Sequence, residues 1–333
     1  MNLPIAPNLR IHKAFLFTVG LWPHQSGFIK NLLLFNTVFF TASQGYLQIG
    51  GMIAAWEDKN VFLESIPPVL VDFVCAAKIV NFLANFNKMK HLLFTLEKDW
   101  EKLKGRKEIE ILHRYVMHGR TLTMTYAGCL YGSMLPFMIV PAVPIFMDIF
   151  LPGNETRTKL LMFRVDFLMD VEKYYYPLLI HSYFGTMAYI TLVVAIDTIL
   201  MIYVLHACGS FAVLGYQLEH LMDGVDIDVN VYPHKDNDTS YNNMSDCVIQ
   251  HNHALDYPGQ MLYDHSIEVS NYVNNCGWYQ TSIRTRKLVS LMTMRSRIPC
   301  AMTAGKFYIL NVANFSAAVR TSMSYLTVLT SVK

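Results

Sequence analysis

The amino-acid sequence predicts an all-α, polytopic membrane protein, and three observations lead to this fold class. Hydrophobic residues make up 53% of the 333 residues and charged residues only 16%, a balance outside the usual range of soluble domains. Two stretches without any charge, residues 31–56 and 121–147, are each long enough to cross a bilayer as a helix. Two more long apolar stretches, residues 174–218 and 307–332, contain one charged residue each.

We expect a single membrane domain over residues 1–333 with five membrane-spanning helices. These spans lie at residues 31–56, 66–87, 121–147, 176–205 and 307–332. The fourth span should continue as a helix beyond the membrane, because Asp197 is the only charge between Lys173 and Glu219. Segments with mixed charge and apolar faces should form further helices outside the membrane, at about 92–119, 206–222 and 262–298.

The second span is unusual because it contains two charged residues, Asp72 and Lys78. Six positions separate them, which is roughly 240° around a helix, so they cannot pair with each other. Each must therefore find another partner or water. Two interpretations stay open: Asp72 faces the helix bundle while Lys78 sits near an aqueous end, or Asp72 lines a path for a ligand or ion.

Loop charges predict the orientation. Residues 1–30 carry Arg10, Lys13 and Lys30 and no acid, so the N-terminus should be cytoplasmic. The alternation of basic and acidic loops then places the C-terminus outside the cell, which is opposite to a G-protein-coupled receptor. The sequon at Asn154 falls on a predicted outside loop and is the expected glycosylation site.

Several other classes of protein find no support. The six cysteines show no C-x-x-C spacing, so we expect no disulfide or zinc framework. The apolar stretch at residues 14–22 lacks a following small-residue cleavage site, so we expect it to be retained rather than removed as a signal peptide. Phosphate-binding loops and catalytic signatures are missing, which disfavours an enzyme, and neither a cofactor nor nucleic-acid binding is indicated.

The C-terminal quarter carries specific motifs. They are Pro258-Gly-Gln260, Asp264-His-Ser266, Trp278-Tyr279, a basic stretch from Arg284 to Arg297, Pro299 to Lys306, and Thr321 to Leu329. Together they resemble the C-terminal signature of insect odorant receptors, particularly the hymenopteran branch, and the resemblance covers nearly every residue from Tyr257 to Ser331. The N-terminal Val19-Gly-Leu-Trp-Pro23 is also similar to the opening of that family.

The resemblance implies an odorant-gated, non-selective cation channel in the plasma membrane of olfactory sensory neurons. Four subunits, this chain and the shared co-receptor among them, would surround one pore. The last helix would line that pore through Tyr325, Val328 and Leu329, which share one helical face and could gate by dewetting. The alternative is that this face packs against a neighbouring helix. Ser324 and Ser331-Val332 depart from the Thr and Gln-Phe that many members carry there.

The resemblance also implies a pocket for a volatile apolar ligand within each subunit. Two rows at helical spacing are candidates for its walls, Tyr131, Met134 and Met138 on the third span and His181, Phe184 and Ala188 on the fourth. Asp72 is a further candidate. The competing interpretation is that these rows are helix-packing core. In the family, cytoplasmic helices form the anchor through which subunits assemble, here at about residues 206–300.

A member of that family should have seven spans, and the missing pair can be located. Residues 247–255 resemble the cytoplasmic start of span five and residues 257–265 the cytoplasmic end of span six, yet Asp256 alone joins them. Roughly sixty residues are absent at this junction, which would reflect a skipped exon, a short isoform or an incomplete gene model. Removing two spans leaves the orientation of the remaining spans unchanged.

The junction leaves two functional hypotheses. The chain is either an odorant-sensing subunit or a five-span subunit that assembles with the co-receptor without sensing odorant. The junction also brings His251, His253, Asp264 and His265 close in sequence, as in a metal site, although a surface helix explains the same spacing and we expect no metal.

Overall fold

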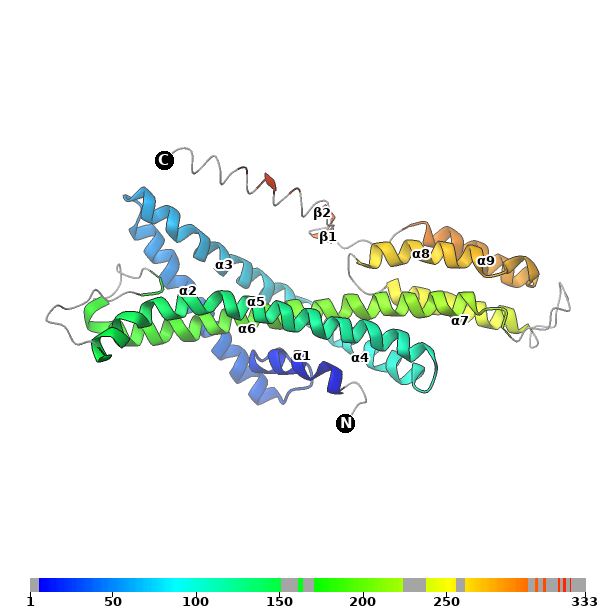
Figure 1. The fold of residues 1–333 in the computed structure, drawn as a ribbon, viewed down its shortest axis with the longest axis horizontal. Helices are drawn as coiled ribbons and strands as arrows, with labels where there is room; N and C mark the ends of the chain where they lie inside the picture. Colours follow the sequence, from blue (N-terminus) through cyan, green and yellow to red (C-terminus); the bar gives the residue numbers. More distant parts are fainter. Residues whose placement is uncertain are drawn as a thin grey trace. The chain divides into compact units, whose positions relative to one another are not determined.

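The computed structural model describes residues 6–150, 161–163, 171–223, 238–255, 261–298, 303–304, 308–309, 317, 320–321 and 324. Its helices are α1 (Ala6–Thr18), α2 (Gly27–Ala54), α3 (Lys59–Ala84), α4 (Phe86–Leu103), α5 (Glu108–Phe150), α6 (Val171–Glu219), α7 (Thr239–Leu255), α8 (Met261–Asn275), the 3₁₀ turn η2 (Trp278–Gln280) and α9 (Ile283–Ser296) (Figure 1). The expected all-α fold class is confirmed, apart from a short antiparallel pair of β1 (Thr303–Ala304) and β2 (Tyr308–Ile309).

The described residues belong to two compact units. Unit 1 comprises residues 1–94 and 120–200, and unit 2 comprises residues 95–119 and 201–333. Helices α4, α5 and α6 are continuous and contribute residues to both units. The boundaries fall where the sequence predicts helices to leave the membrane, since the expected extramembrane segments at about 92–119 and 206–300 belong almost entirely to unit 2.

Three helices are long and apolar enough to cross a membrane among the residues searched. They are α3, residues 108–147 of α5 and residues 173–219 of α6; they contain most of the expected span two and all of spans three and four. Helix α2 contains most of span one. It also carries amide and hydroxyl side chains among its apolar residues, and several of these are buried: Thr37, Thr41, Gln44 and Gln48. Span five was expected over residues 307–332; within it, Tyr308 and Ile309 pair with Thr303 and Ala304 as strands, and most of the remaining residues lie outside the described part of the chain.

In unit 1, the turn between α1 and α2 depends on a glycine. Gly20 has a φ of 73°, and a Cβ placed there would lie 2.4 Å from the backbone nitrogen of Leu34 and 2.6 Å from the carbonyl oxygen of Lys30. Only glycine combines this left-handed conformation with so close an approach of two backbones. Leu21 and Trp22, which follow it, are buried, so the turn closes against the core of the unit.

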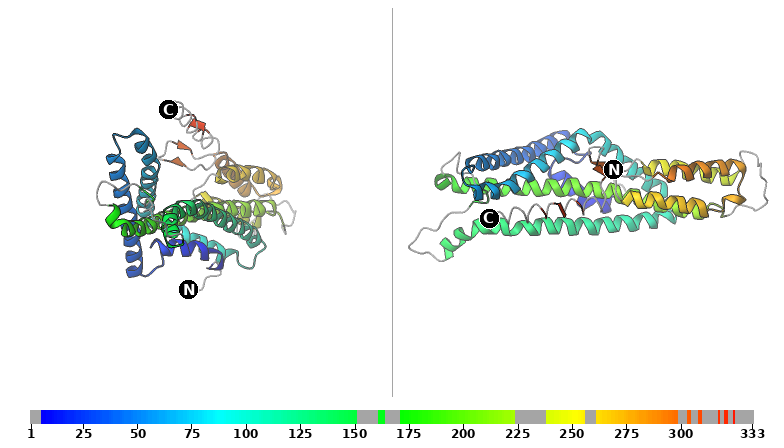
Figure 2. Two further views of the ribbon diagram at one scale, coloured as in Figure 1. Left: turned by 60° about the vertical axis from the view of Figure 1, so that its left-hand side comes forward. Right: turned by 90° about the horizontal axis from the view of Figure 1, so that it is seen from above.

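In unit 2, α9 packs between α7 and α8 (Figure 2). Its buried side chains are Thr285, Val289, Met292 and Ser296, which recur at helical spacing and so define one inward face. Helices α7 and α8 lie on either side of the sequence junction at residue 256, so the segments that flank the junction are both folded against the same helix.

One buried carboxylate joins the starts of α7 and α9. Asp238 is 2% exposed, and its Oδ1 accepts hydrogen bonds from the Tyr241 backbone N–H and the Ser240 hydroxyl, each at 3.0 Å. Its Oδ2 accepts from the Ser282 hydroxyl at 2.6 Å, and Ser282 is itself the N-cap of α9. Because Asp238 satisfies N-terminal groups of two helices at once, it fixes the start of α9 against that of α7.

Candidate functional site

Two charged residues of the apolar helices in unit 1 form an ion pair. Lys78 of α3 forms an ion pair with Oδ1 of Asp197 on α6, and the hydroxyl of Tyr126 on α5 donates to Oδ2 of the same carboxylate at 2.6 Å. The side chains of Lys78 and Asp197 are 29% and 24% exposed, so this ion pair is largely removed from solvent. Asp197 therefore links three helices, and the sequence expectation that Lys78 pairs elsewhere than with Asp72 is confirmed.

Asp72 lies in a separate polar cluster formed by α2, α3 and α6. It is 9% exposed and forms a hydrogen bond with Tyr189. With its amide turned to donate, Gln48 lies 3.0 Å from Asp72 Oδ2. The Tyr189 hydroxyl also lies 2.8 Å from the carbonyl oxygen of Thr41, so Asp72 and Thr41 compete for its single proton. Asp72 thus faces the helix bundle, and its carboxylate meets hydroxyl and amide groups, whereas Lys78 pairs with Asp197 rather than lying at an aqueous end.

The row predicted on α5 faces α6. Tyr131 forms a 3.0 Å hydrogen bond with Thr191, and the carbonyl oxygen of Met138 accepts from Tyr183 at 2.8 Å. Tyr131, Met134 and Met138 are all partly buried, whereas most of the residues between them are exposed. The face identified from spacing is therefore the inward face, and its observed polar contacts serve helix packing.

The row predicted on α6 turns toward α2 instead. His181 bonds to the Ser43 hydroxyl at 2.9 Å, and the rings of His181 and Phe184 both lie 5.7 Å from that of Phe40. Phe184 is 59% exposed, while Ala188 is partly buried. Among the described residues, the row on α5 thus contacts α6, and the row on α6 contacts α2. The hydrogen bonds and ring contacts of these described residues do not join the two predicted rows to one another.

Two polar residues at the α2–α6 contact were missed by the sequence analysis. Gln44 of α2 donates to the Thr186 hydroxyl at 3.2 Å. A Cβ at Gly185 would lie 2.1 Å from Gln44 Oε1, so glycine provides the space for this side chain. The available signal was the presence of amides within an apolar helix, where polar side chains usually face other helices.

Two predicted features fall outside the described residues. They are the pore-facing residues Tyr325, Val328 and Leu329 and the sequon at Asn154. Nearby, Arg320 and Ser324 are helical and exposed.

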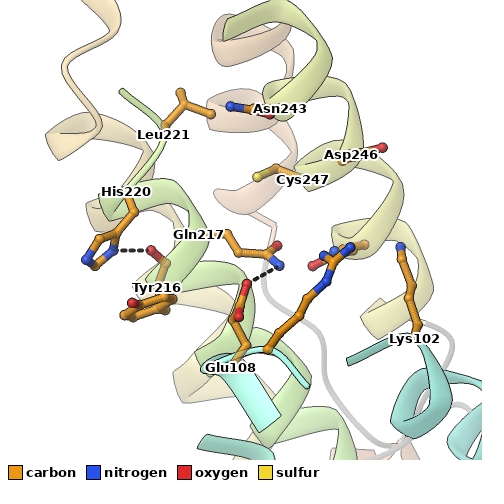
Figure 3. Close-up of a pocket in the computed structure, with 11 residues that line it drawn as sticks. Lys102, Glu108, Tyr216, Gln217, His220, Leu221, Asn243, Asp246 and Cys247 are labelled. Carbon is orange, nitrogen blue, oxygen red and sulfur yellow. Dashed lines mark hydrogen bonds between the residues drawn. The ribbon is translucent and has the colours of Figure 1, made fainter. Parts of the chain in front are cut away.

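Unit 2 contains a polar cavity of about 260 Å³ (Figure 3). It is lined from three sides by the α4–α5 corner, the end of α6 and one face of α7: Lys102, Arg106, Glu108, Tyr216, Gln217, His220, Leu221, Asn243, Asp246, Cys247 and Gln250. Gln217 and Glu108 are 3.5 Å apart, and the Tyr216 and His220 rings stack at 4.0 Å. Burial raises the pKa of the Cys247 thiol to about 12, which leaves it protonated and a poor nucleophile.

The histidines near the junction lie in different surroundings. His251 is 3% exposed and its ring lies against Phe211, whereas His265 contacts Tyr115 and Glu268. Burial and the nearby charge of Arg295 lower the pKa of His251 to about 4. Within the described part of the chain, no group of three or more His, Cys, Asp or Glu side chains is arranged to hold a metal ion, and the cysteines there form no disulfide.

Comparison with known proteins identifies the family. The 7tm odorant receptor family model matches residues 59–258 and 254–323, which is most of the chain. The chain belongs to the 7tm odorant receptor family. The match to this receptor is split into two stretches that overlap at residues 254–258, the position at which the sequence predicts a missing pair of spans. No curated protein matches the sequence.

Solved structures support the same fold for this receptor. It is similar to the insect olfactory receptor OR5 from Machilis hrabei, at 12% identity, a TM-score of 0.65 and coverage of 99% of each chain. The same receptor in complex with eugenol matches with a TM-score of 0.60 and 13% identity, over 99% of this chain and 97% of that chain. At such low identity the likeness shows the fold alone, and the expected all-α membrane bundle of an odorant receptor is confirmed.

Proposed function

We propose that this receptor is a subunit of an odorant-gated, non-selective cation channel formed with the shared co-receptor. The observation that carries the proposal is the family match, which extends from α3 into the last apolar stretch. The eugenol complex of the Machilis receptor supports a small volatile ligand for the fold. Opening would follow from a higher affinity of the odorant for the open state than for the closed state.

The ligand would bind among α2, α3, α5 and α6 of unit 1. The polar cluster at Asp72 and the aromatic contacts of His181 and Phe184 with Phe40 give this region both apolar walls and a few oriented polar groups. That combination is typical of small-molecule sites. The Met134 and Met138 side chains on α5 add adaptable apolar surface.

Current recording tests this proposal. Cells express the receptor alone, the co-receptor alone, or both subunits together. A panel of volatiles is applied to each. We expect odorant-evoked cation current only when both subunits are present. Current that is identical with the co-receptor alone, at verified surface expression of this receptor, would reject an odorant-sensing role.

A second candidate function is favoured by the interruption at residues 254–258: a five-span subunit that assembles with the co-receptor without sensing odorant. Unit 2 remains folded around the junction, because α7 and α8 both pack on α9. The outward face of α9 has Arg284 and Lys287 followed by Leu291 and Met294, the last two being 62% and 66% exposed. Such a stripe suits a protein partner.

Two measurements separate the candidates. Sequencing the antennal transcript across the codons for His253 to Tyr257 shows whether about sixty further codons, enough for two spans, belong there. Co-purification with the co-receptor then tests assembly of the short chain. Assembly at the cell surface without odorant-evoked current favours the second candidate, and a transcript with the additional codons favours the first.

A further inference from the structure

Helix α3 contacts α6 at two positions along the helices, which we call levels. A charged residue of α3 takes part at each level. Asp72 meets Tyr189, and Lys78 meets Asp197, so the partners advance in the same direction along both helices. Tyr189 and Asp197 are eight positions apart and therefore on one face of α6. Asp72 and Lys78 bracket Cys75, which is 1% exposed.

The two levels differ in strength. The Asp72 level consists of hydrogen bonds with Tyr189 and Gln48, whereas the Asp197 level is an ion pair with a second hydrogen bond from Tyr126. An unpaired charge within a membrane helix is strongly unfavourable, so Lys78 and Asp197 each disfavour any sliding of α3 that separates them. A one-residue slide would displace α3 by about 1.5 Å.

Asp197 also lies close in sequence to the boundary between unit 1 and unit 2. It precedes the last residue of unit 1, Leu200, by three positions on α6, and its partner Tyr126 lies six positions after Arg120, where α5 enters unit 1. Helices α5 and α6 continue from unit 1 into unit 2, whereas α3 lies entirely within unit 1. The Asp197 contacts therefore attach α3 to α5 and α6, two of the three helices that both units share.

We propose that Asp197 is a positioning residue: through Lys78 and Tyr126 it fixes the register of α3 against α5 and α6 and so places Asp72 against Tyr189 in the proposed ligand region. The functional part of this inference rests on the proposed odorant-sensing role, and the positional part does not. Asp197 itself need not touch the ligand.

A disulfide reporter tests the register without any ligand. Val193 lies between Tyr189 and Asp197 on α6, at i, i+4 and i+8, so Val193→Cys should face the native Cys75 of α3. Oxidation in membranes should cross-link this pair efficiently. We expect Lys78→Gln or Asp197→Asn to lower the cross-link yield severalfold, and the charge exchange Lys78→Asp with Asp197→Lys to restore it.

A matched control pair reports folding of the bundle. Ser43→Cys with His181→Cys replaces an α2–α6 hydrogen bond and involves neither α3 nor Asp197. Its cross-link yield should be the same in every charge variant. Unchanged Cys75 cross-linking in the single variants, or failure of the charge exchange to restore it while the control pair still forms, would overturn the proposal.

Odorant-evoked current supplies a readout that a purely structural role would not change. At matched surface expression, Lys78→Gln and Asp197→Asn should raise the odorant concentration for half-maximal current about threefold to tenfold, and the charge exchange should reverse this. If the unmodified receptor carries no odorant-evoked current, the odorant-sensing role fails, and the cross-linking alone decides the positional claim.

Discussion

At the scale of single residues, this receptor uses polar side chains in apolar helices as specific links between helices. Lys78, Tyr126 and Asp197 come from three helices and satisfy one another, while Asp72 meets Tyr189 and Gln48. Buried polar groups in a membrane bundle must find such partners, because lipid offers none. The polar residues of unit 1 are therefore the most informative positions for its packing.

Gly20 gives the first prediction. Gly20→Ala should destabilise the receptor by about 1–3 kcal/mol, because the left-handed conformation and the contacts with the Leu34 and Lys30 backbones leave no room for a methyl group. Thermal unfolding in detergent measures the change. Gly27→Ala is the control, since nothing lies within 4 Å of its Cβ position, and equal melting temperatures of the two variants would contradict the account.

Acid should destabilise the protein through its buried histidines. Burial lowers the pKa of His12 and His251 from 6.5 to about 4, with Arg295 adding to the effect at His251. As the pH falls from about 6.5 toward 4, the unfolded chain gains protons that the folded chain does not bind, so stability is full above 6.5 and declines below it.

The melting temperature between pH 7.5 and 4.5 checks this prediction. His251→Leu should flatten the decline, whereas His24→Gln, at an exposed histidine, should leave it unchanged. An equally steep decline in the His251→Leu variant would show that another group is responsible.

At the scale of elements, residue spacing predicted which face of a helix points inward more successfully than it predicted which helix packs against that face. The third span was expected to turn Tyr131, Met134 and Met138 inward, and these residues are the partly buried face of α5. Periodicity could not say that α6 would meet this face through Tyr183 and Thr191, because which helices are neighbours depends on contacts between residues far apart in sequence. For the same reason, Asp197 was noticed as a lone charge and its pairing with Lys78 was not predicted.

Helices form within the segments expected outside the membrane at about 92–119, 206–222 and 262–298, because mixed charge with an apolar face is a strong signal, but the breaks after Leu103 and Asn275 were not predicted. The strand at Tyr308 and Ile309, within the expected fifth span, was also not predicted, because hydropathy does not distinguish an apolar strand from an apolar helix. The Asp238 cluster left no clear sequence signal, since Ser282 is 44 residues away.

Asp238 gives the prediction at this scale. Asp238→Ala should destabilise unit 2 by about 1–3 kcal/mol, because it removes an N-cap of α7 and leaves the buried Ser240 and Ser282 hydroxyls without their acceptor. Asp223→Ala is the control at an exposed aspartate in the turn after α6. Proteolysis of the purified receptor reports the loss: cleavage within α7 to α9 should accelerate in the first variant only.

At the scale of the whole molecule, the contacts of unit 1 agree with an alternating bundle. Helix α5 runs opposite to α6, since the partners of α6 step in the opposite direction along it, while α3 runs with α6. Alternating directions are what successive spans require. Which end of the bundle faces the cytoplasm remains a prediction from the loop charges.

Glycosylation tests that orientation. Asn154 is predicted to lie outside the cell and should carry a glycan, so Asn154→Gln should shift electrophoretic mobility as enzymatic deglycosylation does. Asn243 of α7 is also within a sequon but is predicted to be cytoplasmic, and Asn243→Gln should leave the mobility unchanged. A glycan at Asn243 would reverse the orientation.

The central claim is that this chain is a pore-lining subunit of an odorant-gated channel, and ion permeability tests it most directly. Odorant-evoked current is recorded from cells that express the co-receptor with either the unmodified receptor or a Val328→Ser variant, at matched surface expression. The account predicts an odorant-evoked current whose ion permeability ratios change in the variant, because residue 328 is predicted to face the pore. No odorant-evoked current, or permeability ratios that are identical in the two receptors, would contradict it.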